Sequence, residues 1–116
     1  MWVEVALHWR PENGIGELTM PLYTLIARDR KNGLGQRMAH RPAHLEHMAR
    51  LDAAGCIRYG GPLLDDKGDM AGSLIIIEAD DLESARATFG EDPYIIHGVF
   101  EQYDVIGTKQ IFPRGN

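Results

Sequence analysis

One short segment of this sequence is apolar at consecutive positions, Leu74-Ile75-Ile76-Ile77, and it directly follows Ser73. A strand with a single buried face alternates apolar and polar residues, so a run without alternation is typical of a central strand buried on both sides. Such a strand requires apolar material on both faces of its sheet. This requirement constrains the fold more than any other feature of the chain.

Local signals on either side of this strand predict an alternation of strands and helices. Gly55 is placed to end a long first helix, because glycine adopts the left-handed conformation that follows many helices. Pro42 lies inside that helix and predicts that it restarts or kinks there. Asp80-Asp81-Leu82-Glu83 has the form of a capping box for a second helix, which Gly90 closes. The predicted strands are 22–27, 56–64 with a disturbance at Gly60-Gly61-Pro62, 73–77 and 99–107, and the predicted helices are 34–54, 80–90 and a short turn from Asp92-Pro93 to Gly98.

This β-α-β-β-α-β order is the ferredoxin-like pattern, an α+β fold in which the helices cover one face of an antiparallel sheet. The opposite face must also be buried, and the sequence offers no further element to cover it. Two identical sheets packed against each other would satisfy the requirement. We therefore expect a homodimer formed sheet to sheet.

Composition indicates a single soluble domain and argues against some classes of partner. The chain has 116 residues, of which 44% are hydrophobic and 25% charged, as in ordinary globular proteins. Its net charge of −5 argues against nucleic acid, which favours a basic face. We expect no membrane association, because no apolar run approaches a span of roughly 20 residues and the N-terminus does not resemble a signal peptide. The single cysteine, Cys56, precludes an internal disulfide and fits a cytoplasmic location.

Residues 1–19 differ in character from the rest of the chain. Val3–Leu7 has the composition of a short strand, but a loop with several breakers follows it. We expect the compact domain to comprise residues 20–112, with 1–19 as an N-terminal extension and 113–116 as a tail. The alternative is that Val3–Leu7 adds an extra strand to the sheet.

The long helix carries a polar pair beside its apolar face. At about 100° per residue, Arg41 and His44 fall on the same side as the apolar residues, whereas His40 and His47 lie toward the flank, nearer solvent. A helix N-terminus disfavours a charged imidazole, so the restart at Pro42 would keep His44 neutral and available as a base. The alternative is a boundary histidine with one satisfied hydrogen bond. The apolar face consists of Leu45, Met48, Ala49 and Leu51.

Metal binding is a second interpretation of the same helix. His40, His44 and His47 have helical ligand spacing, and Glu46 lies nearby. However, the pattern of zinc hydrolases needs a glutamate directly after the first histidine, and the cation Arg41 occupies that position. No other cluster supplies a third ligand. We therefore expect neither a metal nor another cofactor.

Asp92 also has two interpretations. It precedes Pro93, and an aspartate before proline is a good helix N-cap because its carboxylate accepts backbone N–H bonds that proline does not need. The structural role does not exclude a catalytic one, since one carboxylate oxygen can cap while the other orients an imidazole. Both interpretations stay open at this point.

The remaining candidates have ordinary structural explanations as well. Gly60-Gly61-Pro62 is typical of a strand-ending bulge, although glycine also allows the backbone to approach a ligand closely. Cys56 is expected in the core. Tyr59, Tyr94 and Tyr103 are expected to pack with a tethered hydroxyl rather than to donate protons.

Several short motifs occur in the order and spacing of a known family. Over residues 20–112 the sequence resembles the YciI-like (YCII-related) family of the dimeric α+β barrel group. The resemblance implies a catalytic pair at His44 and Asp92, with Arg41 and Ser73 near the same cleft. One branch of that family removes chloride from a chlorinated hydroxyquinol. The matching segments are Leu22-Tyr23, Ala27-Arg28-Asp29, Arg41-Pro42-Ala43-His44-Leu45, Gly61-Pro62, Gly72-Ser73, Asp92-Pro93-Tyr94, Gly98-Val99 and Lys109-Gln110-Ile111-Phe112.

Two functional hypotheses follow. In the first, the protein is a cofactor-free lyase or isomerase for an anionic or phenolic small molecule: His44 moves a proton, Asp92 orients the imidazole and Arg41 holds substrate charge. In the second, it is a non-catalytic ligand-binding or accessory dimer. A heme- or oxygen-using monooxygenase belongs to the same fold group, but no motif marks a heme site. The expected substrate-binding residues are Arg41, Gly61, Pro62, Ser73 and Tyr94.

Overall fold

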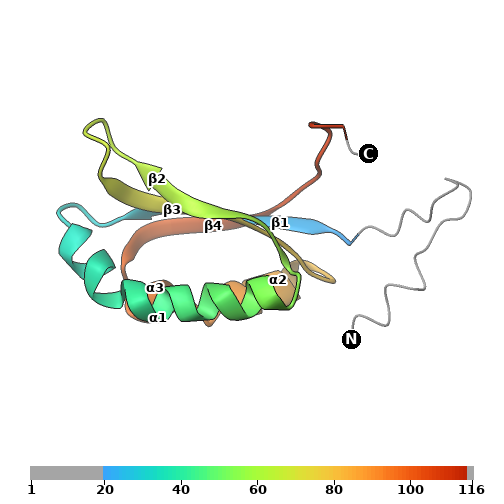
Figure 1. Cartoon of the computed structure of the whole chain (residues 1–116), viewed down its shortest axis with the longest axis horizontal. Coiled ribbons are helices and arrows are strands. Elements are labelled where there is room, and N and C mark those ends of the chain that lie inside the picture. Colours follow the sequence, from blue (N-terminus) through green and yellow to red (C-terminus); the bar gives the residue numbers. More distant parts are fainter. Residues whose placement is uncertain (1–19, 115–116) are drawn as a thin grey trace, which may run out of the picture.

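The computed structural model describes residues 20–114, which form a four-stranded antiparallel sheet and three helices (Figure 1). The predictions for residues 1–19 lie outside the described residues, as does the end of the 113–116 tail. No helix in the described part is long and apolar enough to cross a membrane. The strands are β1 (Leu22–Asp29), β2 (Ile57–Leu64), β3 (Met70–Glu78) and β4 (Phe100–Thr108), and the helices are α1 (Leu34–Ala53), α2 (Leu82–Gly90) and α3 (Pro93–Ile96).

The strands lie in the order β2-β3-β1-β4 across the sheet. β1 is central, and its Leu25 lies opposite Ile75 of β3 on one side and Val105 of β4 on the other. β3 is the second interior strand, as the apolar run predicted. Burial on both faces is not seen in the single chain: Ile75 and Ile77 are buried, whereas Leu74 and Ile76 are only half-buried. The element order confirms the ferredoxin-like α+β prediction, with α3 as a short addition before β4.

All three helices lie on one side of the sheet (Figure 1). α1 runs through Pro42 as one continuous helix, so the predicted restart does not occur. Pro42 lies on the exposed side of α1, where water can replace the hydrogen bond that the proline ring removes. Beyond the helix end, Gly55 has the predicted left-handed conformation, with φ of 77°.

The start of α2 differs from the predicted capping box. Asp81 is the N-cap, and its carboxylate accepts a hydrogen bond of 2.8 Å from the backbone N–H of Ser84. In a capping box the third residue after the cap is a glutamate or glutamine that bonds back to the cap. Here the third residue is Ser84, so the predicted pairing of Asp80 with Glu83 is not formed and the cap is the carboxylate of Asp81.

Irregularity in β2 also falls at different residues from those predicted. The pairing register with β3 shifts between Ile57 and Tyr59 and again between Leu63 and Leu64, whereas Gly60-Gly61-Pro62 pairs in regular succession. Proline is tolerated here because β2 is an edge strand, where a missing backbone donor costs no ladder hydrogen bond on the open side. The glycines and the proline are therefore part of the strand.

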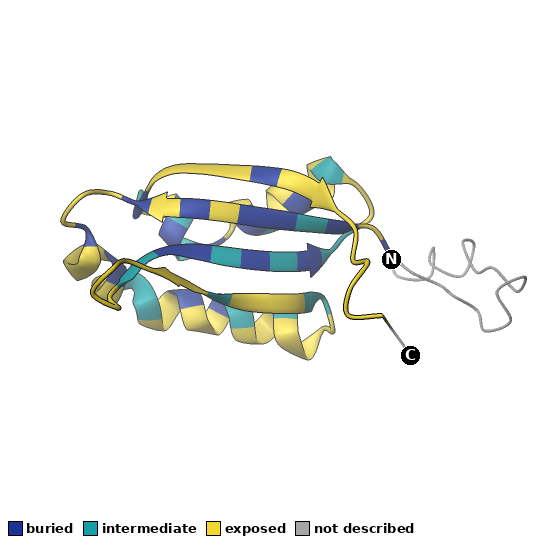
Figure 2. Ribbon diagram, turned by 90° about the horizontal axis from the view of Figure 1, so that it is seen from above, coloured by how far each residue is buried: buried dark blue, intermediate teal, exposed yellow. Residues whose placement is uncertain are grey.

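The core lies between the sheet and the helices, and the other face of the sheet is open in the single chain (Figure 2). Side chains that alternate with the core residues point to this open face. Ile26, Leu63 and Ile106 are 43%, 36% and 49% exposed there. The buried core cluster consists of Leu25, Ala27, Ile75, Ile77, Ala85, Phe89, Tyr94, Val99, Phe100 and Val105.

Candidate active site between the long helix and the sheet

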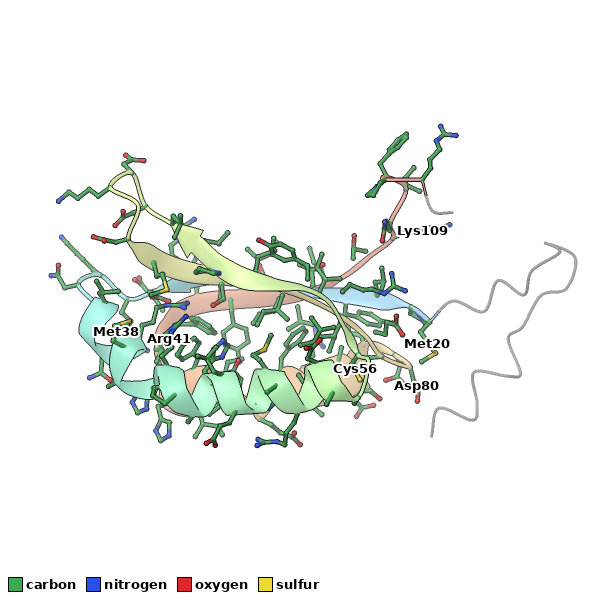
Figure 3. All side chains as sticks on the ribbon, viewed as in Figure 1. Met20, Met38, Arg41, Cys56, Asp80 and Lys109 are labelled. Atoms are coloured by element: carbon green, nitrogen blue, oxygen red, sulfur yellow. The ribbon has the colours of Figure 1, made fainter. Side chains whose placement is uncertain are left out.

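A cavity of about 220 Å³ lies between the N-terminal half of α1 and strands β2 and β3. Figure 3 shows Arg41 extending from α1 into the space below the sheet. All five residues predicted to bind substrate line this cavity, and so does His44. The complete lining is Arg37, Arg41, His44, Leu45, Met48, Gly60, Gly61, Pro62, Met70, Ser73, Ile75 and Tyr94.

His44 and Asp92 are in direct contact, as the family resemblance implied. The Nδ1 atom of His44 lies 2.9 Å from Oδ1 and 3.0 Å from Oδ2 of Asp92. An ionised carboxylate can only accept hydrogen bonds, so the proton of a neutral imidazole belongs on Nδ1. The other ring nitrogen, Nε2, then carries a lone pair and can act as a base. His44 lines the cavity, whereas Asp92 does not line it and is 1% exposed.

The carboxylate of Asp92 caps a helix and contacts the imidazole of His44 at the same time. Its Oδ1 accepts a hydrogen bond of 2.9 Å from the backbone N–H of Tyr94, which makes it the N-cap of α3. Pro93 occupies the first helical position, where its missing N–H costs nothing. The cap fixes the carboxylate relative to α3, and the carboxylate in turn fixes the ring of His44 on α1.

Tyr94 packs directly against this pair. Its ring stacks on the ring of His44 with centroids 3.9 Å apart and an interplanar angle of 10°. The guanidinium of Arg37 also lies over the Tyr94 ring, 4.6 Å from its centroid. Burial raises the pKa of the Tyr94 phenol, although the positive charges of Arg37 and Arg41 act in the opposite direction. The phenol is therefore a protonated hydrogen-bond donor at neutral pH.

Arg37 is a site residue that the sequence analysis missed. It is 2% exposed, and its Nε and Nη2 atoms donate to the two carboxylate oxygens of Asp29 at 2.8 and 3.2 Å. Nη2 also donates to the carbonyl oxygen of Gly72 at 2.6 Å and to Oγ of Ser73 at 2.7 Å. The guanidinium thus joins α1 to the end of β1 and to β3. A usable signal was its spacing, since Arg37 lies four residues before Arg41 on the same helical face.

The inward face of α1 is rotated relative to the prediction. Its buried residues are Arg37, His44 and His47. His47 is 4% exposed rather than solvent-facing, and Leu45 is 44% exposed although it borders the cavity. The prediction followed apolar residues alone, whereas two of the residues that turn inward are polar groups with distant partners: Arg37 bonds to the sheet and His44 to Asp92. His40 lies at the flank as predicted and stacks on His97, with centroids 4.2 Å apart.

The predictions for Cys56 and the tyrosines were wrong in detail. Cys56 is only half-buried and does not belong to the core cluster; burial, followed by the nearby charge of Glu78, raises the pKa of its thiol. Tyr59 and Tyr103 are 50% and 47% exposed rather than packed in the interior. Tyr94 is packed, but no described residue is hydrogen-bonded to its hydroxyl.

Within residues 20–114, no three His, Cys, Asp or Glu side chains come together in a way that could hold a metal ion.

The fold and the site together define the class of protein. It is a small ferredoxin-like α+β protein with a histidine–carboxylate pair that opens onto one cavity. The sequence matches the YCII-related domain family over residues 21–109, and the chain belongs to this family.

Individual relatives agree with this assignment. Protein YciI of Escherichia coli is 35% identical over 97 residues, which cover 78% of this chain and 99% of that protein. A protein of Haemophilus influenzae is 30% identical over 96 residues, or 78% of this chain and 98% of its own length. Among solved structures, 5-chloro-2-hydroxyhydroquinone dehydrochlorinase from Burkholderia phenoliruptrix, in complex with 2,5-dihydroxybenzoquinone, matches with a TM-score of 0.69 and 31% identity. That match covers 77% of this chain and 94% of the dehydrochlorinase.

The ion pair of Arg37 leads to a stability prediction. Arg37→Met should lower the free energy of unfolding by about 3–5 kcal/mol, because it leaves the carboxylate of Asp29 buried and uncompensated. Arg58→Met is the matched control: Arg58 pairs with Glu78 at 2.7 Å but its side chain is 38% exposed, so the loss should be about 1 kcal/mol or less. Urea denaturation measures both. Equal losses would contradict the structural role assigned to Arg37.

Proposed function

We propose that this protein is a cofactor-free enzyme, a lyase or isomerase that moves a proton on a small anionic or phenolic molecule. The observation that carries the proposal is the contact of 2.9 Å between His44 Nδ1 and the buried carboxylate of Asp92, placed so that His44 borders the cavity. This arrangement is the one expected of a general base oriented by a carboxylate.

In the proposed reaction, Nε2 of His44 removes a proton from the bound substrate. The imidazolium that forms is stabilised by the negative charge of Asp92, which is hydrogen-bonded to the opposite side of the ring. Because the carboxylate of Asp92 also accepts a hydrogen bond from the backbone N–H of Tyr94, it can keep its orientation while the charge on the imidazole changes. The same imidazolium can then return the proton at another position or to a leaving group.

The charge of the cavity lining supports an anionic substrate. Among residues 20–114, no carboxylate lines the cavity, whereas the guanidinium groups of Arg37 and Arg41 both do. Arg37 is neutralised by Asp29, so Arg41 is the cation proposed to hold the substrate. Ser73 would add a hydroxyl donor. Gly61 and Pro62 would form the apolar wall opposite the helix, and Tyr94 the wall beside the base.

The relatives support a reaction of this kind without fixing it. The dehydrochlorinase acts on 5-chloro-2-hydroxyhydroquinone, a phenolic molecule, and was crystallised with 2,5-dihydroxybenzoquinone. Loss of chloride from such a ring is an elimination that a positioned base can assist. We therefore propose this chlorinated phenol as the first substrate to test on this chain, and the quinone as the first ligand.

The catalytic role of Asp92 leads to a kinetic prediction. Asp92→Asn should lower the rate of chloride release about 10²–10⁴-fold, because the amide can offer the wrong group to Nδ1 and cannot balance the imidazolium. Its thermal stability should change little, since asparagine caps a helix about as well as aspartate. His44→Ala should lower the rate of chloride release by a similar factor.

Asp81→Asn is the matched control for that experiment. Asp81 caps α2 by the same type of hydrogen bond, 2.8 Å from Ser84, but does not line the cavity. Its substitution should leave the rate unchanged. A wild-type rate in Asp92→Asn, or a protein that binds the quinone but releases no chloride, would instead favour the non-catalytic ligand-binding dimer.

We also propose that the protein is a homodimer joined through the open face of the sheet. Ile26, Leu63 and Ile106 are partly exposed on that face, and contiguous apolar patches of several hundred Å² are rare on monomers. A domain boundary at Met20 and a cytoplasmic location remain predictions of the sequence.

The dimer has a direct test. In sedimentation at micromolar concentration, the wild type should be a dimer, and Ile26→Glu should yield monomer, because it places a charge in the centre of the open face. Ile96→Glu is the control, since Ile96 is 62% exposed but lies on α3, on the opposite side of the sheet. A wild-type monomer, or a dimer that tolerates Ile26→Glu, would refute the proposed interface.

A further inference from the structure

The hydroxyl group of Tyr94 stands out among the buried polar atoms. Tyr94 is fully buried, and its Oη is the one buried side-chain oxygen or nitrogen in residues 20–114 without a hydrogen-bond partner in the protein. Burying a hydroxyl without a partner is unfavourable, so such groups are rare and require an explanation. The residue also lines the cavity beside His44.

Packing accounts for the Tyr94 ring but not for its hydroxyl. The ring stacks on His44, lies under the guanidinium of Arg37 and meets the ring of Phe100 edge-on at 5.7 Å. A phenylalanine would make all three contacts and would bury no unpaired oxygen. The hydroxyl therefore has no use in the folded chain alone, which points to a bound molecule as its partner.

The other polar groups of the cavity indicate what that molecule must offer. Ser73 Oγ accepts a hydrogen bond from Arg37, so its own proton is free to be donated. Arg41 can only donate, and the phenol of Tyr94 is a donor because burial keeps it protonated. Of the described side chains that line the cavity, His44 is the one suited to take a proton from the ligand. A complementary ligand thus presents oxygen acceptors to Tyr94, Ser73 and Arg41 and an acidic proton to His44.

We propose that the hydroxyl of Tyr94 donates a hydrogen bond to the substrate oxygen on which negative charge develops when His44 removes the proton. This selects molecules in which a phenolic, enolic or carboxylic oxygen lies next to the acidic position. The inference rests on the proposed function, because it places the ligand in the same cavity. The rings of Tyr94 and His44 stack with centroids 3.9 Å apart, so the proposed donor and the base are carried by adjacent side chains that can act on one small molecule.

The cavity volume narrows the ligand further. At about 220 Å³ it is smaller than the sites of about 300–1,000 Å³ that hold drug-sized molecules. A single oxygenated ring or a short-chain acid fits this volume better than a nucleotide or a peptide. The substrate class that we infer is therefore a small oxyanion-forming acid with one ring or fewer.

The test is Tyr94→Phe, measured in two ways. In the ligand-free protein, this variant should melt at the same temperature as the wild type or higher, because it removes an unpaired buried oxygen. Calorimetric titration with 2,5-dihydroxybenzoquinone should show binding weakened about tenfold, the value expected for one hydrogen bond to a charged oxygen. Tyr103→Phe is the control: Tyr103 does not line this cavity, and its substitution should leave quinone binding unchanged.

Each outcome is informative. A Tyr94→Phe protein that binds the quinone as tightly as the wild type, or that melts well below it, would overturn the inference, as would a wild type that does not bind the quinone. His44→Ala separates this inference from the proposed function. If that variant keeps the wild-type rate while Tyr94→Phe weakens binding, the proton-transfer role of His44 fails and the binding role of Tyr94 stands.

Discussion

The buried carboxylate of Asp92 determines how the helical layer is arranged. A carboxylate that is 1% exposed needs partners for its charge, and this one has the backbone N–H of Tyr94 and the imidazole of His44. One partner is on α3 and the other is on α1, so the pair fixes how these two helices lie against each other. Because Nδ1 of His44 is bound to Asp92, Nε2 is the ring nitrogen left to act in the cavity that His44 lines. Architecture and proposed chemistry therefore depend on a single group.

A second buried charge holds the other side of the cavity. Arg37 is paired with Asp29 and also donates to Gly72 and Ser73, so it ties α1 to the two interior strands. The two networks meet at Tyr94, which stacks on His44 and lies under Arg37. Both charges are compensated before any ligand binds, which leaves Arg41 and the hydroxyl of Tyr94 to act on the ligand. In a site built in this way, the supporting side chains are held rigidly and the groups that bind the ligand are left without partners among the described residues.

The sequence predicted those parts of the structure that depend on local pattern. The order of elements follows from periodicity and turn residues, and the capping role of Asp92 follows from the proline after it. The burial of Arg37 could not be derived in this way, because a charged residue is buried only where a distant partner such as Asp29 is available. No described contact explains the burial of His47. The predicted restart of the helix at Pro42 was wrong for a related reason, because the effect of a proline on α1 depends on which side of the helix faces water. The contact of His44 with Asp92 was predicted only with the help of the family resemblance.

The most direct test of this account is the tautomer of His44. Nitrogen-15 NMR of the histidine side chains, at a pH where the imidazole is neutral, distinguishes a protonated from an unprotonated ring nitrogen. The account predicts a proton on Nδ1 of His44 and a free lone pair on Nε2, and loss of this preference in Asp92→Asn. A neutral His44 with its proton on Nε2 would contradict the account, because the nitrogen facing the substrate could not then accept a proton.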